Sequence, residues 1–338
     1  MIDYPTGLIE KRRRLLAAIT GVFIAPIWFG PIAGAAGEVT YSDGPIRFIG
    51  PLPAGGASDF LARLTGARLG DALGQPVVVE NRPGAAGRIA MEYAARAAPD
   101  GHTIFLATNG TSSIGPNQQT GNGVDLSRSF IPVTKLARLP IVIAVAPALG
   151  VRTLRELIDR ARRAPGALAY ASSGVGSTSH LAAQLLFQRA NVALVHVPYS
   201  GTAFAVKDTL SGEVPILFSN MGTIAGHVRS GQLRALAVAG AHRVDALPGV
   251  PTVAESGFPG FDVSTWLGVL VPAGTPAPIV ARLNEELVRI VKSPDVREQL
   301  ANLGMEPIGN SPADFAAELE ADGERWAKVI RESRIPAE

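Results

Sequence analysis

The chain of 338 residues contains no cysteine. It therefore has no disulfide framework, and it has no N-terminal cysteine that could carry a lipid anchor. The sequence also lacks a net basic field once its first 36 residues are set aside. Those residues hold four basic and two acidic side chains, so 27 of each sign remain in the rest of the chain. This balance gives no reason to expect binding to nucleic acid or to anionic lipid.

Motifs for catalysis and for cofactor binding are also missing. The chain has neither a G-x-S-x-G segment nor a G-x-x-x-x-G-K-[ST] phosphate loop. The stretch from Gly174 to Ser179 approaches G-x-G-x-x-G but ends in serine, and no two of the five histidines have a short metal-ligand spacing. We interpret His180 as a packing residue with hydrogen bonds rather than as a base. The sequence therefore predicts no catalytic residue, no metal and no cofactor.

The first 36 residues have the pattern of an export signal. Lys11 to Arg14 are basic, the run from Leu15 to Ile32 is uncharged and apolar, and Ala33 to Ala36 are small. This order predicts a secretory signal peptide cleaved near residue 36, which places the mature protein in the periplasm. The alternative is an uncleaved anchor, because a run of about 18 uncharged residues is long enough to span a membrane. The arginines also resemble a twin-arginine signal, so the export route stays open.

Strand and helix patterns alternate from Gly44 onward, and this alternation predicts an α/β fold with mainly parallel sheets flanked by helices. The expected strands are residues 46–49, 77–80, 103–107, 133–136, 141–145, 168–171, 194–197, 214–218, 234–239 and 263–271. The expected helices are residues 58–73, 85–98, 154–163, 178–190, 202–210, 222–230, 278–291 and 312–332. A polar loop is expected over residues 108–122.

The mature length suits two domains, and no flexible linker separates them. We therefore expect two lobes joined by crossing strands near residues 138–141 and 261–266, with a ligand cleft between the lobes. Lobe 1 would comprise residues 37–139 and 262–338, and lobe 2 would comprise residues 140–261.

Five of the expected strands end in turns rich in glycine, hydroxyl and amide groups, and none of these turns contains Lys or Arg. A turn that opens a helix points backbone N–H groups at one spot, where the helix dipole adds a partial positive charge. Ordinary caps use the same residues, for example Ser58 or Asp59 as an N-cap. Five such turns nevertheless predict a cleft that holds an anion through neutral dipoles, with Tyr199 either lining the cleft or packing beneath it. The candidate ligand-binding residues are Ala54, Gly55, Gly56, Ser58, Asp59, Thr108, Asn109, Ser173, Gly174, Ser177, Thr178, Ser179, Tyr199, Ser219 and Asn220.

Six longer segments together resemble one family, the substrate-binding receptors of tripartite tricarboxylate transporters of the Bordetella uptake gene type. The segments are Pro51 to Gly56 with Asp59, Val79 to Ala85, Ala98 to Thr103, Tyr170 to Gly174 with Ser179 to Leu181, His196 to Tyr199, and Leu247 to Gly257. The resemblance covers nearly the whole mature chain, from Ile46 to Trp326.

The resemblance implies a two-lobed, type II-like periplasmic binding protein. Such a protein captures a small organic carboxylate and delivers it to the membrane components of a tripartite tricarboxylate transporter. It also implies that backbone amides and ordered waters of the turn from Ala54 to Asp59 hold one ligand carboxylate, and that the opposite lobe contributes the turn from Ser173 to Ser179. We expect the mature protein to be a monomer.

Two departures from the family pattern bear on the ligand. The lysine that usually follows Pro-Tyr is Ser200 here, and the usual acidic residue before Asn220 is Ser219. An amino-acid ligand is therefore less expected than a simple organic or aromatic acid. Two other functions remain open from the sequence, namely a ligand sensor for a signalling partner and an exported α/β hydrolase.

Overall fold

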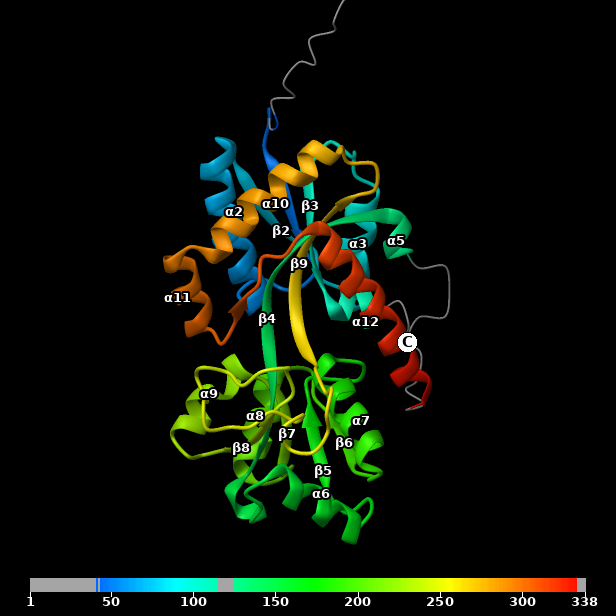
Figure 1. The fold of residues 1–338 in the computed structure, drawn as a ribbon, viewed down its shortest axis with the longest axis vertical. Coiled ribbons are helices and arrows are strands. Elements are labelled where there is room, and N and C mark those ends of the chain that lie inside the picture. The colour runs from blue at the N-terminus through cyan, green and yellow to red at the C-terminus, as the bar shows by residue number, and fades with distance from the viewer. Residues whose placement is uncertain (1–40, 42, 115–123, 333–338) are drawn as a thin grey trace, which may run out of the picture. The chain divides into compact units, whose positions relative to one another are not determined.

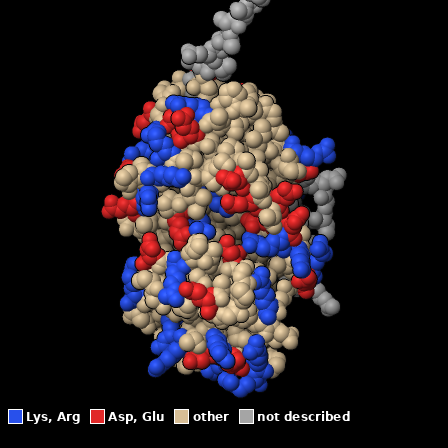
Figure 2. Space-filling model, viewed as in Figure 1, with Lys and Arg blue, Asp and Glu red and all other residues tan. Residues whose placement is uncertain are grey.

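The computed structural model describes residue 41, residues 43–114 and residues 124–332. The predicted signal peptide lies outside these residues. The described residues belong to one compact unit, Tyr41–Glu338. On the face shown in Figure 2, basic and acidic side chains are interspersed rather than gathered by sign.

The described strands form one path of neighbours in the order β2-β1-β3-β9-β4-β7-β5-β6, and both β8 and β10 pair with β4. The strands β1, β2 and β3 pair in parallel, as do β5, β6 and β7, whereas every pairing of β4 and β9 is antiparallel. The α/β class is therefore confirmed, with a mixed sheet. The strands are β1 (Ile46–Gly50), β2 (Val77–Asn81), β3 (Thr103–Thr108), β4 (Phe130–Val145), β5 (Ala169–Ser172), β6 (Val195–Pro198), β7 (Ile216–Asn220), β8 (Arg234–Val238), β9 (Ser264–Pro272) and β10 (Glu306–Pro307).

The long strand β4 connects two groups of strands (Figure 1). Its first part pairs with β9, and its last five residues pair with β7. We expected two separate strands here, residues 133–136 and 141–145, but one strand runs through Pro140, which has no N–H to donate to a sheet. Pro140 lies where β4 changes partner, opposite Ser264 on β9 and just before Ile141, which pairs with Asn220. At such a change of partner a proline interrupts neither ladder, so the strand continues.

The helices follow the sequence pattern, with a few differences. Helix α3 is shorter than expected and follows a 3-10 turn at Ala85–Gly87, and Gly110–Ile114 forms a π-helical turn inside the expected polar loop. Helices α5 and α11 and strand β10 were not anticipated. The helices are α2 (Ala57–Leu73), α3 (Arg88–Ala95), α5 (Leu126–Ser129), α6 (Leu154–Arg163), α7 (Thr178–Ala190), α8 (Thr202–Ser211), α9 (Met221–Arg229), α10 (Ala277–Lys292), α11 (Pro294–Asn302) and α12 (Pro312–Glu332).

The buried side chains form separate clusters around the two groups of strands. One cluster contains Phe48 of β1 and Leu283 of α10, and another contains Tyr170 of β5 and Phe187 of α7. The second cluster also contains Trp326, from the far end of α12. The expected lobe boundaries place all of α12 in lobe 1, so this contact shows that its end also packs against the other group of strands. The boundaries themselves stay a prediction.

Candidate ligand-binding site

The first candidate turn connects β1 to α2. Helix α2 begins at Ala57, and its N-cap is Gly56, whose backbone is extended with φ −86°. Neither Ser58 nor Asp59 is the N-cap, because both lie inside the first helical turn, where they are buried. Gly55 has a φ of +86°, a conformation that favours glycine. The residues Ala54, Gly55 and Gly56 are exposed to solvent.

A buried carboxylate holds this turn in place. The Gly55 N–H donates to Asp59 Oδ2 at 2.8 Å, and Arg63 Nε donates to the same oxygen at 3.1 Å. The hydrogen bond from Arg63, followed by that from Gly55, lowers the pKa of Asp59. The Gly55 amide is therefore already engaged. The N–H groups of Ala57, Ser58 and Asp59 belong to the first turn of α2, where a helix offers no backbone acceptor.

The end of β3 forms the second turn. The Thr108 N–H donates to Thr111 Oγ1 at 3.0 Å, and the Thr111 N–H donates to Thr108 Oγ1 at 3.1 Å. These reciprocal bonds close the turn around Asn109, whose side chain is 1% exposed. Asn109 Nδ2 donates to the carbonyl of Ser264 at 3.0 Å, while Asn109 Oδ1 is buried and has no hydrogen-bond partner among the described residues.

The end of β7 meets the same part of β9. Ser219 is buried, and its hydroxyl donates to the carbonyl of Asn220 at 3.2 Å. Asn220 Oδ1 accepts a hydrogen bond from Thr265 Oγ1 at 3.0 Å. Asn109 and Asn220 thus bond to consecutive residues at the start of β9. The structure brings the ends of β3 and β7 together there, although the two asparagines are far apart in the sequence.

The turn between β5 and α7 is held mainly by its own side chains. The Ser173 N–H donates to Ser179 Oγ at 3.1 Å, the Gly174 N–H to Ser172 Oγ at 3.2 Å, and the Gly176 N–H to His180 Nδ1 at 3.1 Å. Ser177 is the N-cap of α7, and its hydroxyl accepts from the His180 N–H at 3.3 Å.

The hydroxyl groups of Ser173, Ser177 and Ser179 form a connected cluster in this turn. Ser179 Oγ lies 3.0 Å from each of the other two, and Ser177 Oγ donates to the carbonyl of Gly174 at 2.8 Å. Because the single hydroxyl proton of Ser177 goes to the Gly174 carbonyl, Ser179 must donate to Ser177, and Ser173 must donate to Ser179. The Ser173 hydroxyl therefore ends the chain and can turn towards a ligand without breaking the other two bonds.

Tyr199 is engaged within its own part of the fold. Its hydroxyl donates to Asp208 Oδ2 of α8 at 2.8 Å, and its ring packs against a buried cluster that includes Leu217. Burial, together with Asp208, raises the pKa of Tyr199 to about 12. Of the two positions left open by the sequence, these contacts favour packing beneath the site.

Sequence reasoning missed several residues that support the turns. Arg63 is absent from the candidate list although it pairs with Asp59, and so are Ser264 and Thr265, which bond to the two asparagines. His196 was quoted only as part of a motif, yet its ring stacks on that of His180 with centroids 3.8 Å apart. A salt-bridge spacing of four residues could have suggested Arg63. The other contacts join residues that are distant in the sequence.

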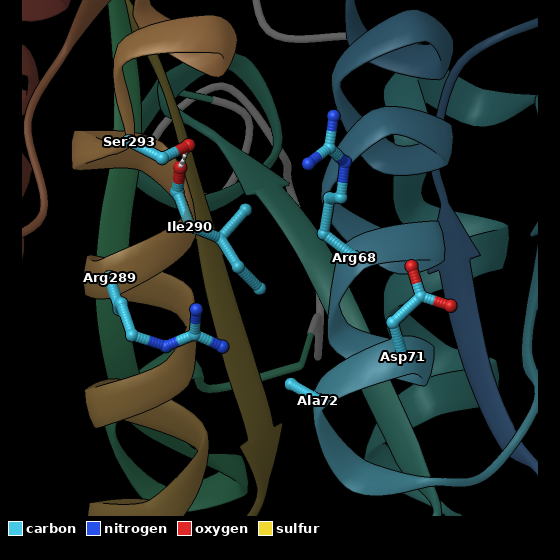
Figure 3. A pocket seen from close by; sticks show the side chains of 6 residues that line it. All are labelled: Arg68, Asp71, Ala72, Arg289, Ile290 and Ser293. Carbon is cyan, nitrogen blue, oxygen red and sulfur yellow. Dashed lines mark hydrogen bonds between the residues drawn. The ribbon is translucent and has the colours of Figure 1, made fainter.

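Three cavities on the described surface lie away from these turns. Figure 3 shows one of about 310 Å³ between α2 and α10, where Arg68 and Arg289 lie on facing helices. Both arginines are paired with carboxylates, Arg68 with Asp295 at 2.5 Å and Arg289 with Glu286. The other cavities, of about 260 and 370 Å³, also contain none of the candidate residues.

Within the part of the chain that the structure describes, no helix is long and apolar enough to cross a membrane.

The fold is that of a periplasmic binding protein, and comparison with known proteins gives the family. The profile of the tripartite tricarboxylate transporter family receptor matches residues 61–335. Protein BugT of Bordetella pertussis is 36% identical over 321 residues, which cover 95% of this chain and 97% of BugT. The chain therefore belongs to the tripartite tricarboxylate transporter receptor family.

Two solved structures from Rhodopseudomonas palustris share the fold. Rpa4515, solved with adipate, is 35% identical with a TM-score of 0.76, and the match covers 88% of this chain and 99% of Rpa4515. MatC, solved with bound malate, is 31% identical with a TM-score of 0.71, and the match covers 86% of this chain and 100% of MatC. The predicted family and the predicted fold of a periplasmic binding protein are confirmed.

Proposed function

We propose that this protein is an extracytoplasmic substrate-binding receptor that captures a small organic carboxylate. It would act in the periplasm after cleavage near residue 36 and deliver its ligand to the membrane components of a tripartite tricarboxylate transporter. The observation that carries the proposal is the N-terminus of α2 at the Gly55 turn, in a chain of this receptor family. There the first-turn amides have no acceptor within the helix, while Asp59 fixes the preceding loop.

A carboxylate suits this turn because aligned N–H groups and the helix dipole together favour an anion. The negative charge of Asp59 would oppose a bound anion, but Arg63 lies 3.0 Å from Asp59 Oδ1 and balances it. Two relatives of similar fold were solved with the carboxylates adipate and malate. These findings support a carboxylate for this chain without fixing which one.

The proposed site extends from this turn to the other candidate turns. Asn109 and Asn220 would face the ligand from the start of β9, and the turn from Ser173 to Ser179 would close on it from the second lobe. This proposal keeps the expected division, with residues 37–139 and 262–338 in lobe 1 and residues 140–261 in lobe 2. The strands β4 and β9 run between the two groups of strands and would act as the hinge.

The neutral side chains of the site narrow the ligand class. Ser200 and Ser219 replace a cation and a carboxylate of the family pattern, so neither a second carboxylate nor an amine finds a charged partner at these positions. We therefore propose a simple organic or aromatic acid. We also propose that the protein acts as a monomer, does not bind nucleic acid, and catalyses no reaction.

The experiment compares carboxylates with neutral analogues of the same shape. Purified mature protein is titrated by calorimetry with a panel that includes adipate, malate and benzoate, and each positive ligand is compared with its amide. A carboxylate that binds only the folded protein should also raise the melting temperature. We expect at least one acid to bind and its amide to fail. Equal binding of acid and amide would contradict an anion site. The site would also be contradicted if the ligand that co-purifies with the native protein were uncharged.

A further inference from the structure

Two histidine rings, the buried His180 and the partly buried His196, lie face to face directly behind the turn from Ser173 to Ser179. His180 comes from the first turn of α7 and His196 from β6, and their ring planes differ by only 5°. The ring of Tyr170, on β5, continues the stack with its centroid 5.0 Å from that of His196. Nothing in the proposed binding of a carboxylate uses these rings directly.

One nitrogen of each ring nevertheless forms a hydrogen bond at the turn. His180 Nδ1 accepts the N–H of Gly176 at 3.1 Å, and His196 Nε2 lies 2.7 Å from Ser172 Oγ. Ser172 Oγ in turn accepts the N–H of Gly174 at 3.2 Å. The stacked pair thus holds the two glycines of the turn, whose φ angles of +130° and +69° few other residues adopt.

The hydrogen bond from Gly176 fixes the protonation state of His180. A ring nitrogen accepts a hydrogen bond only when it carries no proton, so His180 is neutral and its proton lies on Nε2. His180 Nε2 lies 3.4 Å from Gln184 Nε2, which also lies 2.9 Å from the Tyr170 hydroxyl. With the oxygen and nitrogen of the amide exchanged, Gln184 accepts the protons of both His180 Nε2 and the Tyr170 hydroxyl. Burial, and then the neighbouring His196, lowers the pKa of His180 to about 3, while burial lowers that of His196 to about 4. Both rings therefore stay uncharged at neutral pH.

We propose that His180 and His196 are positioning residues that hold the ligand-binding turn in its binding conformation. The inference deepens the proposed function and rests on it, because it assumes that the turn from Ser173 to Ser179 contacts the ligand. By tying down Gly174 and Gly176, the pair directs the first-turn amides of Thr178 and Ser179, and the Ser173 hydroxyl, which can turn from Ser179 towards a ligand. A turn fixed in advance binds more tightly, because ordering it on binding costs free energy.

A packing role and a positioning role require different features of the rings. Packing needs only apolar volume, whereas positioning needs an acceptor at His180 Nδ1 and a polar atom at His196 Nε2. His180→Asn keeps an oxygen at the same number of bonds from the backbone as Nδ1, and His196→Gln keeps a polar atom at the place of Nε2. His180→Leu and His196→Leu keep bulk without these atoms.

The experiment measures carboxylate affinity and melting temperature for the four variants. The probe is the tightest binder found among adipate, malate and benzoate. We expect each leucine variant to bind about tenfold more weakly or worse, which corresponds to about 1.4 kcal/mol. The asparagine and glutamine variants should recover most of that affinity even where their melting temperatures fall. Equal losses in the leucine and amide variants would overturn the proposal in favour of packing, and unchanged affinity in the leucine variants would overturn it outright.

A second measurement needs no ligand and separates this proposal from the proposed function. Nitrogen-15 NMR of the free protein should show His180 Nδ1 unprotonated, with a slowly exchanging Gly176 amide that becomes fast in His180→Leu and stays slow in His180→Asn. If wild type binds no carboxylate but shows this pattern, the proposed function fails while the positioning of the turn stands. A Gly176 amide that exchanges equally fast in all three proteins overturns the positioning role whatever the ligand.

Discussion

Gly55 and Asp59 are joined by a hydrogen bond of 2.8 Å between the backbone N–H and Oδ2, across the turn that opens α2. The bond closes the exposed loop onto a buried side chain, because Asp59 is only 6% exposed. It also changes the set of amides expected to face a ligand. Gly55 shapes the turn, and the donors left for an anion are those of the first helical turn behind it.

The first prediction compares two adjacent glycines. Gly55→Ala puts a side chain on a residue with φ +86°, which costs about 1–3 kcal/mol or opens the turn. Gly56→Ala is the matched control, since Gly56 is extended and an added Cβ would meet only the Pro53 carbonyl, at 3.9 Å. We expect Gly55→Ala to weaken carboxylate binding at least tenfold, about 1.4 kcal/mol, and Gly56→Ala to change it little. Calorimetric titration measures both, and equal affinities would remove the Gly55 conformation from the binding mechanism.

The second prediction concerns the carboxylate that holds the turn. Asp59→Ala removes the acceptor of the Gly55 N–H and leaves Arg63 without its carboxylate partner, although Arg63 still donates to Asn81 Oδ1. Each hydrogen bond to a charged group contributes about 1.5–3 kcal/mol, so we expect a lower melting temperature together with weaker ligand binding. Arg63→Met is the control, because it keeps the bond between Gly55 and Asp59 while removing the cation. Its ligand affinity should fall through the unbalanced negative charge of Asp59, and this loss should shrink in high salt. An Asp59→Ala protein with wild-type affinity would show that the turn needs no such bond.

Local signals in the sequence were enough to predict many elements and their bounds. Helix α6 is residues 154–163 as expected, because Thr153 caps its start and Pro165 and Gly166 follow its end. Helix α7 is residues 178–190 as expected, with Ser177 as its cap. Caps and breakers act within a few residues, so a single sequence shows them.

The sequence could not predict features that depend on which segments become neighbours. The sequence predicted two strands where β4 is one, and the change of partner from β9 to β7 at Pro140 explains why the strand continues. His180 was correctly expected to pack and to form hydrogen bonds, but its partner His196 lies 16 residues away on another strand. The candidate turns were recognisable from their residue types. Whether they surround a ligand stays a prediction. Hydrogen bonds to β9 bring two of them together, those at Asn109 and Asn220.

The third prediction tests a close contact between α9 and the loop after α11. A Cβ on Gly222 would lie 2.1 Å from the backbone carbonyl oxygen of Leu303, so Gly222→Ala forces a backbone to move. Gly226→Ala, in the same helix, meets no atom within 4 Å. Alanine favours a helix over glycine by about 0.8–1 kcal/mol, so we expect the melting temperature to rise for Gly226→Ala and to fall for Gly222→Ala. Thermal melts of the two variants make the comparison. A stabilised Gly222→Ala protein would show that the backbone at Leu303 can shift at little cost in free energy.

The last prediction concerns the stability of the protein in acid. His180 and His196 titrate near pH 6.5 in the unfolded chain, whereas burial lowers their pKa values in the fold to about 3 and about 4. Between these values the unfolded chain binds protons that the folded protein does not, so the free energy of unfolding falls as the pH drops. Above about pH 6.5 both states hold the rings neutral, and this contribution to the pH dependence disappears.

The groups in contact with the pair do not offset this effect. Tyr170 stays neutral throughout the acid range, because burial raises its pKa, and Gln184 and Ser172 do not titrate. The double variant His180→Asn with His196→Gln removes both titrating rings and keeps every carboxylate. We therefore expect its melting temperature to fall less than that of wild type between about pH 7 and about pH 4.5. Melts across this range measure the difference. Parallel curves for the two proteins would mean that the rings are protonated in the fold, and His180 Nδ1 could then not accept the Gly176 N–H that holds the turn.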